Sequence, residues 1–221
     1  MGMEAAAGLR LSVGRASVAR RGSLAALLGE AASARFIRHL EGATKAVEEA
    51  GPDLEPDAVE AIAARARAEL LLERHLGADR VGEVRLDEAL STLVTRRQLA
   101  SSVLVEAVTS MPVVVAPGPV ATALVAALCE LVHVFEVAAV PGAGVRIVLA
   151  VGIADGGLLI ALAARGVDLS PVPSRGAAHA IRRAGRIVRL VDGDLTRGVR
   201  DETMLFGMVV GTVAPVGSVD L

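Results

Sequence analysis

Two long amphipathic helices near the start of the chain constrain its fold most strongly. From Ser23 to Ala50 apolar side chains recur at steps of three and four residues, and charged side chains fall between them. The apolar positions are Phe36, Leu40, Ala43, Val47 and Ala50. Residues 51–53 end this helix, and Pro56 with nearby acidic residues begins a second one that runs to Gly77. A short connection between two helices predicts an antiparallel hairpin.

Such a hairpin cannot bury both apolar stripes by itself. Pairing with a second copy into a four-helix bundle buries them, so we expect a homodimer through Ala31–Ala50 and Val59–Leu76. Residues 1–22 carry four arginines and no continuous apolar stretch, which indicates a flexible extension without a signal peptide. The expected divisions are therefore 1–22, the hairpin 23–80 and a second domain 81–221.

The second domain mixes strands and helices. We expect helices at 86–99, 120–139 and 174–184, and strands at 102–108, 112–115, 145–153, 158–164, 187–191 and 203–213. Asp155, Gly156 and Gly157 indicate a hairpin turn between two of these strands. The order predicts an α+β chain, in which a helical hairpin precedes a mixed sheet with helices on one face.

Composition excludes several classes of function. Of the 221 residues 53% are hydrophobic and 22% charged, with a formal net charge of −2, so neither disorder nor a polycation for DNA fits. Aromatic residues make up 1%, which argues against stacking on nucleic-acid bases. The single cysteine, Cys129, fits a reducing cytoplasm. Glu130, His133 and Glu136 interrupt the apolar stretch 120–140, so we expect a buried helix and no membrane insertion.

Two stretches resemble sensor histidine kinase cores. Glu69–Leu93 resembles the second hairpin helix and its exit, and Val120–Ala139 resembles the helix that carries the magnesium and nucleotide motif. The similarity covers about residues 20–213. In length, the chain resembles bacterial histidine phosphotransferases more than it resembles the kinases. This resemblance implies a dimeric four-helix bundle followed by an ATPase-like α/β sandwich, with the receiver domain of a response regulator as partner.

The nucleotide motifs that the resemblance implies are degenerate here. Glu130, Leu131 and Val132 match the buried helix motif, but Val134 stands at its asparagine position and has no oxygen to coordinate magnesium. The adenine motif is best matched by 164–168, where Ala164 replaces the aspartate, Gly166 remains and Asp168 replaces the second glycine. The phosphate-binding glycines are reduced to Gly176. We expect no ATP, no other cofactor and no metal.

The histidine that would accept phosphate is also displaced. Alignment with the first hairpin helix of the family puts the acceptor near 32–34, where Ala32, Ser33 and Ala34 stand. His39, on the flank of the same helix, is the candidate phosphoacceptor, and its alternative role is a boundary residue packed against the stripe. His75 matches a histidine of the family that is not the acceptor, or simply ends a helix.

The remaining chemistry-bearing residues have structural interpretations. His133 and Cys129 are expected in the core, and His179 has no acidic neighbour that would suggest a metal site. A basic cluster is expected to form a solvated helix face, with a docking patch for an acidic partner as the alternative. Its members are Arg182, Arg183, Arg186 and Arg189.

The sequence therefore leaves three hypotheses. The first is a cytoplasmic two-component signalling protein without ATP binding, which either relays phosphate through His39 or docks a receiver domain without catalysis. The second is a divergent kinase that binds ATP weakly through Glu130 and backbone groups. The third is a non-catalytic interaction module of unrelated ancestry.

Overall fold

The larger of two sheets forms the frame of the molecule. The structure is a computed structural model, and it describes residues 9–13, 18–50, 59, 82–100, 104–107, 111–170 and 173–215. The larger sheet has five strands in the order β3-β5-β6-β8-β7. Their bounds are β3 Leu104–Ala107, β5 Arg146–Ala154, β6 Gly157–Arg165, β8 Thr203–Val210 and β7 Gly193–Arg200. Strands β3 and β5 run parallel and the other neighbours antiparallel, so the expected mixed sheet is confirmed.

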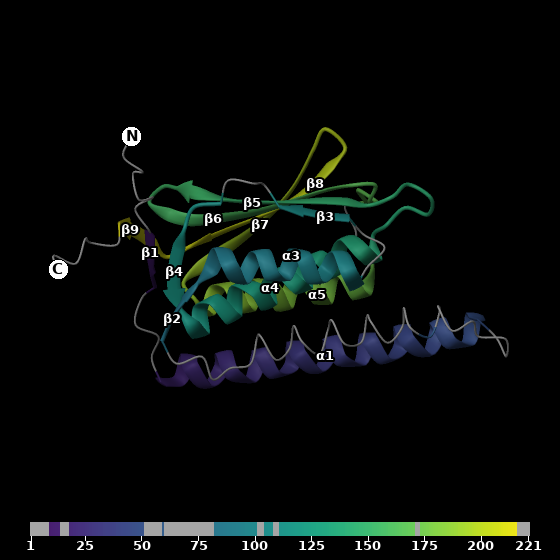
Figure 1. Cartoon of the computed structure of the whole chain (residues 1–221), viewed down its shortest axis with the longest axis horizontal. Helices are drawn as coiled ribbons and strands as arrows, with labels where there is room; N and C mark the ends of the chain where they lie inside the picture. Colours follow the sequence, from purple (N-terminus) through teal and green to yellow (C-terminus); the bar gives the residue numbers. More distant parts are fainter. Residues whose placement is uncertain are drawn as a thin grey trace.

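Three helices cover one face of this sheet (Figure 1). They are α3 Leu86–Ala100, α4 Gly118–Val137 and α5 Arg175–Leu190. Alternate residues of β5, β6 and β8 point toward them and are buried, because successive side chains of a strand face opposite sides. Phe135 of α4 meets Phe206 of β8 with ring centroids 5.5 Å apart, which joins the helical layer to the sheet.

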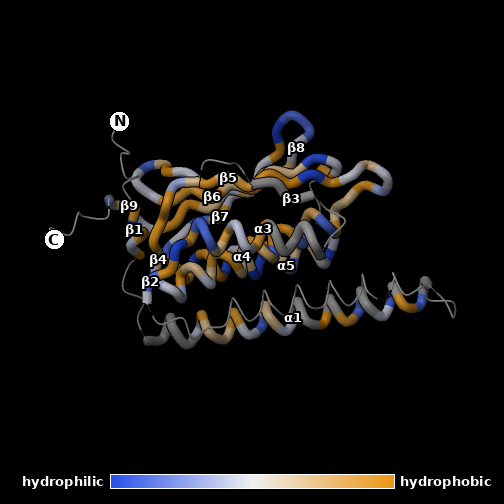
Figure 2. Tube along the Cα trace, in the orientation of Figure 1, coloured by the Kyte–Doolittle hydropathy of each residue, from blue (hydrophilic) through white to orange (hydrophobic). Residues whose placement is uncertain are grey.

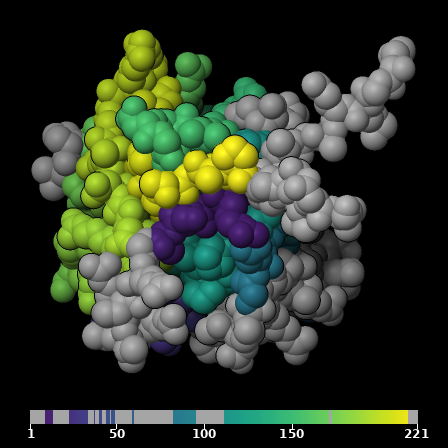
Figure 3. All heavy atoms as spheres, turned by 90° about the vertical axis from the view of Figure 1, so that its left-hand side faces the viewer, coloured from purple at the N-terminus to yellow at the C-terminus, as the bar shows by residue number. Residues whose placement is uncertain are grey.

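A smaller, four-stranded sheet closes one end of the molecule. Its order is β2-β4-β1-β9, with bounds β2 Glu83–Arg85, β4 Val114–Pro117, β1 Leu9–Ser12 and β9 Thr212–Pro215. Strand β1 runs parallel to β4 and antiparallel to β9, and Figure 3 shows the three side by side at this end. The expectation of a loose extension over residues 1–22 is therefore wrong for Leu9–Ser12. The backbone bonds of β1 to two neighbours and the burial of Leu11 fix this segment.

Helix α4 is the central element of the core. Nearly all of its residues are buried, and most of them are apolar (Figure 2). Within the part of the chain that the structure describes, it is the one helix long and apolar enough to cross a bilayer, but 83% of its most apolar window is buried inside the protein. Pro119 in its first turn fits the helix start, where a missing N–H costs no hydrogen bond.

Two sequence expectations about the C-terminal strands are wrong. Residues 187–190 end α5 instead of forming a strand, because Ile187 and Val188 continue the buried stripe of Ala180 and Ala184. The strand expected at 203–213 is two strands, β8 and β9, separated by Gly211 at a φ of +54°. An added Cβ on Gly211 would lie 2.3 Å from the carbonyl oxygen of Ser12, so only glycine fits there.

The turn between β5 and β6 confirms the expected hairpin. Asp155 and Gly156 both have positive φ angles, 52° and 75°, which is typical of the two-residue turns that match strand twist. The second helix of the expected N-terminal hairpin falls within residues 51–81, of which only Val59 is described, so that hairpin stays a prediction.

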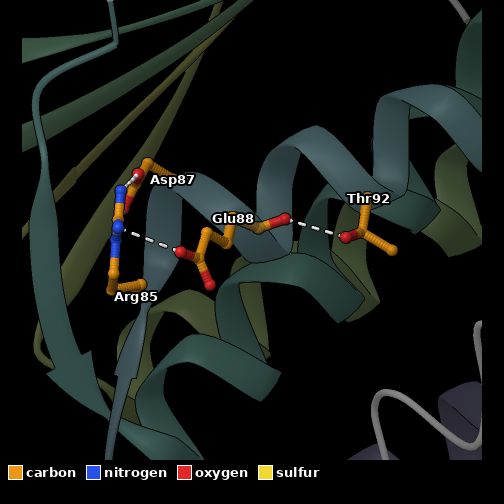
Figure 4. Close-up of polar contacts among 4 residues, drawn as sticks. All are labelled: Arg85, Asp87, Glu88 and Thr92. Carbon is orange, nitrogen blue, oxygen red and sulfur yellow. Dashed lines mark hydrogen bonds and ion pairs between the residues drawn. The ribbon is translucent and has the colours of Figure 1, made fainter.

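Helix α3 begins at a cluster of charges (Figure 4). The Nη2 atom of Arg85 lies 2.6 Å from Asp87 Oδ2, and its Nη1 atom lies 3.0 Å from Glu88 Oε1. The hydrogen bond to Asp87, and then the charge of that carboxylate, raise the pKa of Arg85 above its usual value. Two acidic residues in the first turn also suit the positive end of the helix dipole. These contacts fix the point where β2 becomes α3.

Helix α1 spans Val18–Ala50 and lies against the other side of the helical layer (Figure 1). Its first half packs on α5 and α4 through Leu27 and Ala31, which are buried. In its second half Ile37 and Leu40 are each 53% exposed and Val47 is 46% exposed. At about 100° per residue, the exposed stripe lies roughly opposite the packed one on the helix circumference. Thus α1 has two apolar faces: one packs on α4 and α5, and the other is about half exposed and contacts none of the other described helices.

Candidate functional site

The glutamate of the expected nucleotide motif forms a buried ion pair. Glu130 of α4 is fully buried, and its Oε2 accepts from Nη2 of Arg183 at 2.7 Å and from Nε at 3.1 Å. Arg183 lies on α5, and only 15% of its side chain is exposed. A carboxylate taken out of water needs such a charge-assisted partner. The pair therefore joins α4 and α5. The guanidinium of Arg183 is the cation that binds the Glu130 carboxylate.

Val134 lies one turn beyond Glu130 and is buried. It contributes a hydrophobic wall to a pocket of about 260 Å³ between the end of α4, the start of α5 and strands β7 and β8. Val137, Val140, Ala177 and Met204 also line this pocket. At the position where the resemblance implies an oxygen ligand for magnesium, the structure presents an aliphatic side chain instead.

The few polar groups of this pocket contact its own loop. Asp168 Oδ1 accepts from the backbone N–H of Ser170 at 2.9 Å, and Arg197 Nη2 donates to the carbonyl oxygen of Ser170 at 3.1 Å. Ser174 caps α5 by accepting from the N–H of Ala177 at 3.3 Å. These bonds hold the loop before α5. Among the residues described here, no group of three or more His, Cys, Asp or Glu could hold a metal ion.

The motif glycines have unequal roles. Gly166 has a φ of +78°, and an added Cβ would lie 2.5 Å from the carbonyl oxygen of Gly144, so this glycine is required by the backbone. A Cβ added to Gly176, near the start of α5, would have no atom within 4 Å, so the backbone does not require glycine there. Ala164, at the aspartate position of the adenine motif, is fully buried in β6. The tight turn at Gly166 is therefore present, and Ala164 beside it carries no polar side chain.

The histidines are dispersed through the structure. His133 is partly buried on α4, with Nδ1 3.5 Å from Glu136 Oε2, so it lies at the edge of the core. His179 is exposed on α5, and Cys129 is buried as expected. His39 is in α1, but its side chain lies outside the described part of the structure, and His75 lies outside it altogether. The proposal for His39 therefore rests on the sequence.

The basic cluster on α5 is divided between two environments. Arg182, Arg186 and Arg189 are exposed, but Arg183 points into the core, so the expectation of a shared solvated face is wrong for it. Arg186 Nη1 lies 4.0 Å from Glu30 Oε2 of α1, across a groove of about 440 Å³. The Glu130–Arg183 pair was not predicted from the sequence, because 53 residues separate the two side chains. The available signal was Glu130 in the middle of an apolar helix, because a buried carboxylate requires a cation as partner.

Known structures show which class of fold these elements form. No protein-family model and no curated protein matches the chain. Solved structures with a similar fold include a bacterial phosphotransferase and a histidine kinase, so the resemblance inferred from the sequence is confirmed at the level of the fold.

Two of these structures define the similarity. A bacterial phosphotransferase has a TM-score of 0.57 and 15% identity, with 89% of this chain and 100% of that chain covered. The Erythrobacter litoralis EL346 blue-light activated histidine kinase has a TM-score of 0.50 and 13% identity, with 86% of this chain and 60% of that chain covered.

Proposed function

We propose that this chain is a two-component signalling protein of the phosphotransferase type that works without ATP. Its similarity to the bacterial phosphotransferase, with a TM-score of 0.57 over the whole of that chain, supports this class. The proposal includes a homodimer and a receiver domain of a response regulator as partner.

The observation that best supports the proposed absence of ATP binding is the Glu130–Arg183 pair. A carboxylate held at 2.7 Å by a guanidinium inside the core is not open to a hydrated magnesium ion. Val134 adds no oxygen, and Ala164 cannot accept a hydrogen bond from an adenine amine. Three positions thus favour a pocket without nucleotide.

Nucleotide titration tests this part of the proposal. Full-length protein is heated with increasing ATP analogue and magnesium, next to an ATP-binding histidine kinase core as positive control. We expect no change in Tm at millimolar ligand, because a ligand that binds only the folded state must raise it. A saturable rise that Glu130→Gln abolishes would establish the divergent kinase instead.

The uncovered half of α1 is the surface that we assign to protein partners. Ile37, Leu40 and Val47 form an exposed apolar stripe that faces away from α4 and α5. Helix pairing with a second copy would bury it, and the sides of the resulting bundle would remain open to a receiver domain. His39 lies within this half of the helix, where a phosphoryl group could pass to or from that partner.

Phosphotransfer is tested with receiver domains that carry labelled phosphate on their aspartate. We expect acid-labile label on the wild-type chain, none on His39→Gln, and normal labelling of the matched control His179→Gln. Binding of a receiver without any labelling would establish docking without catalysis. Neither labelling nor calorimetric binding with any receiver of the source organism would overturn the partner assignment.

A further inference from the structure

The exposed face of α5 carries a line of basic side chains. We call this the arginine stripe; its members are Arg175, Arg182, Arg186 and Arg189, with His179 in the same line. The five positions recur at steps of four and three residues, so they lie within about 80° of one another on the helix. All five are exposed, and the buried residues of α5 lie on the opposite side. The stripe is about 21 Å long, since a helix rises about 1.5 Å per residue.

The chain itself supplies little negative charge to this stripe. Among the described residues, Glu30 is the only carboxylate within 4.0 Å of a stripe nitrogen atom; it faces Arg186, and both side chains are more than half exposed. An exposed pair at this distance contributes little. Arg182 and Arg186 are four residues apart and Arg186 and Arg189 three, spacings at which like charges repel one another along a helix. An acidic surface placed on the stripe would remove this repulsion.

One end of the stripe borders the groove between α1 and α5. This groove of about 440 Å³ has room for an aliphatic side chain of another molecule. Its lining combines Ala26, Leu27 and Leu190, which are apolar, with Arg186 and Arg189 of the stripe. A ligand that fits both features carries acidic groups along one face and an apolar side chain next to them.

A protein helix has this combination of groups. Its side chains recur at steps of three and four residues, so carboxylates on one face repeat at the spacing of the stripe. Phosphates of a nucleic acid or of a bilayer surface supply charge without an aliphatic side chain at that spacing. We propose that the arginine stripe and the groove together bind an amphipathic acidic helix of a protein partner. The site uses residues 23–30 of α1 and not the half that carries His39, so it does not depend on the proposed signalling function.

Binding of designed peptides tests the proposal with the full-length protein. The probe is a fluorescent helical peptide with glutamates at steps of three and four residues on one face and leucines beside them. Its control is an equally helical peptide of the same composition, with both residue types distributed around the helix. We expect saturable binding of the probe, weakened by added salt, and binding at least about tenfold weaker for the control. Equal binding of the two peptides, or no binding of the probe, would overturn the proposal.

Charge reversal tests whether the peptide binds at the stripe. Arg182→Glu combined with Arg189→Glu should weaken binding of the probe at least about tenfold. A peptide with lysines in place of the glutamates should bind this double variant better than wild type. Arg165→Glu combined with Arg200→Glu changes two exposed arginines away from α5 and is the matched control. Circular dichroism checks that both variants fold, and equal loss of affinity in the two would contradict binding at the stripe.

The groove is tested by a substitution that fills it. Ala26 is exposed, so Ala26→Phe occupies the groove without entering the core. It should weaken binding of the leucine-containing probe and leave unchanged the binding of a peptide with alanines in place of the leucines. An equal effect on both peptides would refute the role of the groove.

Other anions distinguish a protein partner from a nucleic acid or a membrane. A short DNA duplex and vesicles of phosphatidylcholine with phosphatidylserine are titrated at the same salt concentration as the probe. Both should bind more weakly than the probe, because neither uses the groove. Tighter binding of either one, lost in the double variant Arg182→Glu and Arg189→Glu, would assign the stripe to that ligand and exclude the acidic helix.

Discussion

The environment of Glu130 is set by its ion pair with Arg183. A glutamate in a fully buried position would be costly alone, because its charge loses the solvation of water. Arg183 offsets that cost with two hydrogen bonds to the same oxygen, and the pair becomes part of the α4–α5 contact. Both hydrogen bonds go to Oε2 of Glu130, so this carboxylate contributes to the packing of the two helices.

Removing the cation tests this interpretation. Arg183→Met should lower the free energy of unfolding by about 3–5 kcal/mol, because it leaves the Glu130 carboxylate buried without its partner. The double variant with Glu130→Met should recover most of the loss, since two apolar groups replace two charges. Urea unfolding measures both values. Exposed Arg182→Met is the control, and an equal effect of the two arginine substitutions would refute the structural role of the pair.

At the scale of single elements, α1 combines two surfaces on one helix. Its first half contributes Leu27 and Ala31 to the core, while its second half leaves an apolar stripe exposed on roughly the opposite side. The second stripe is available to a further helix, which is what the predicted hairpin and the proposed bundle both require. This division favours packing on the body for the start of α1 and packing on another helix for its end.

A charge in the exposed stripe should affect association and leave the fold intact. Leu40→Glu should shift sedimentation toward the monomer, because two facing stripes cannot bury a carboxylate. The free energy of unfolding extrapolated to low protein concentration should change by less than about 0.5 kcal/mol, since position 40 is half exposed. Lys45→Glu, on the same helix outside the stripe, is the control. Equal sedimentation of both variants and wild type would exclude this stripe from the interface.

Elements whose sequence pattern is local were predicted well, and elements whose structure depends on contacts with other segments were not. The apolar run of α4 and the turn at Asp155 and Gly156 are local, and both were predicted correctly. Strand β7 was missed, because GDLTRGVR at the sheet edge is mostly exposed and lacks apolar alternation. The end of α5 was mistaken for a strand, since Ile187 and Val188 are β-branched and only packing on α4 shows the helical period.

The site was less predictable than the fold for the same reason. The degenerate positions Val134 and Ala164 could be identified from the sequence alone, and the structure places both in the core. The partner of Glu130 was not identified: helical spacing puts Arg183 beside the buried stripe of Ala180 and Ile187, but the pattern of α5 does not show which residue of another helix it meets. A contact across 53 residues depends on the packing angle of two helices.

At the scale of the whole molecule, the smaller sheet joins segments from distant parts of the chain. Strand β1 lies between β4 and β9, and Gly211 bends the chain after β8 so that β9 can pair with it. The five-stranded sheet and its helices form one body, and the four-stranded sheet fixes the first described strand to the last (Figure 3).

The core residue of β1 tests how much this link contributes. Leu11→Ala should lower the free energy of unfolding by about 2–5 kcal/mol, because Leu11 is 1% exposed and its truncation removes buried apolar contacts and leaves a cavity. Amide exchange in β9 should accelerate more than exchange in the β5–β6 hairpin. Ser12→Ala, exposed on the same strand, is the control. Unchanged protection of β9 in a destabilised Leu11→Ala chain would show that β1 does not hold it.

The pairing of β1 with β9 also sets an order of events during synthesis. Residues 9–12 leave the ribosome early, yet the strand that flanks them on one side arrives only with residues 212–215. Contacts this distant in sequence form late, because a long loop must close first. A nascent chain can therefore assemble β5, β6 and the helices while its first strand still has an open edge. Of the described strands, β9 is the last to be made, and it completes the smaller sheet.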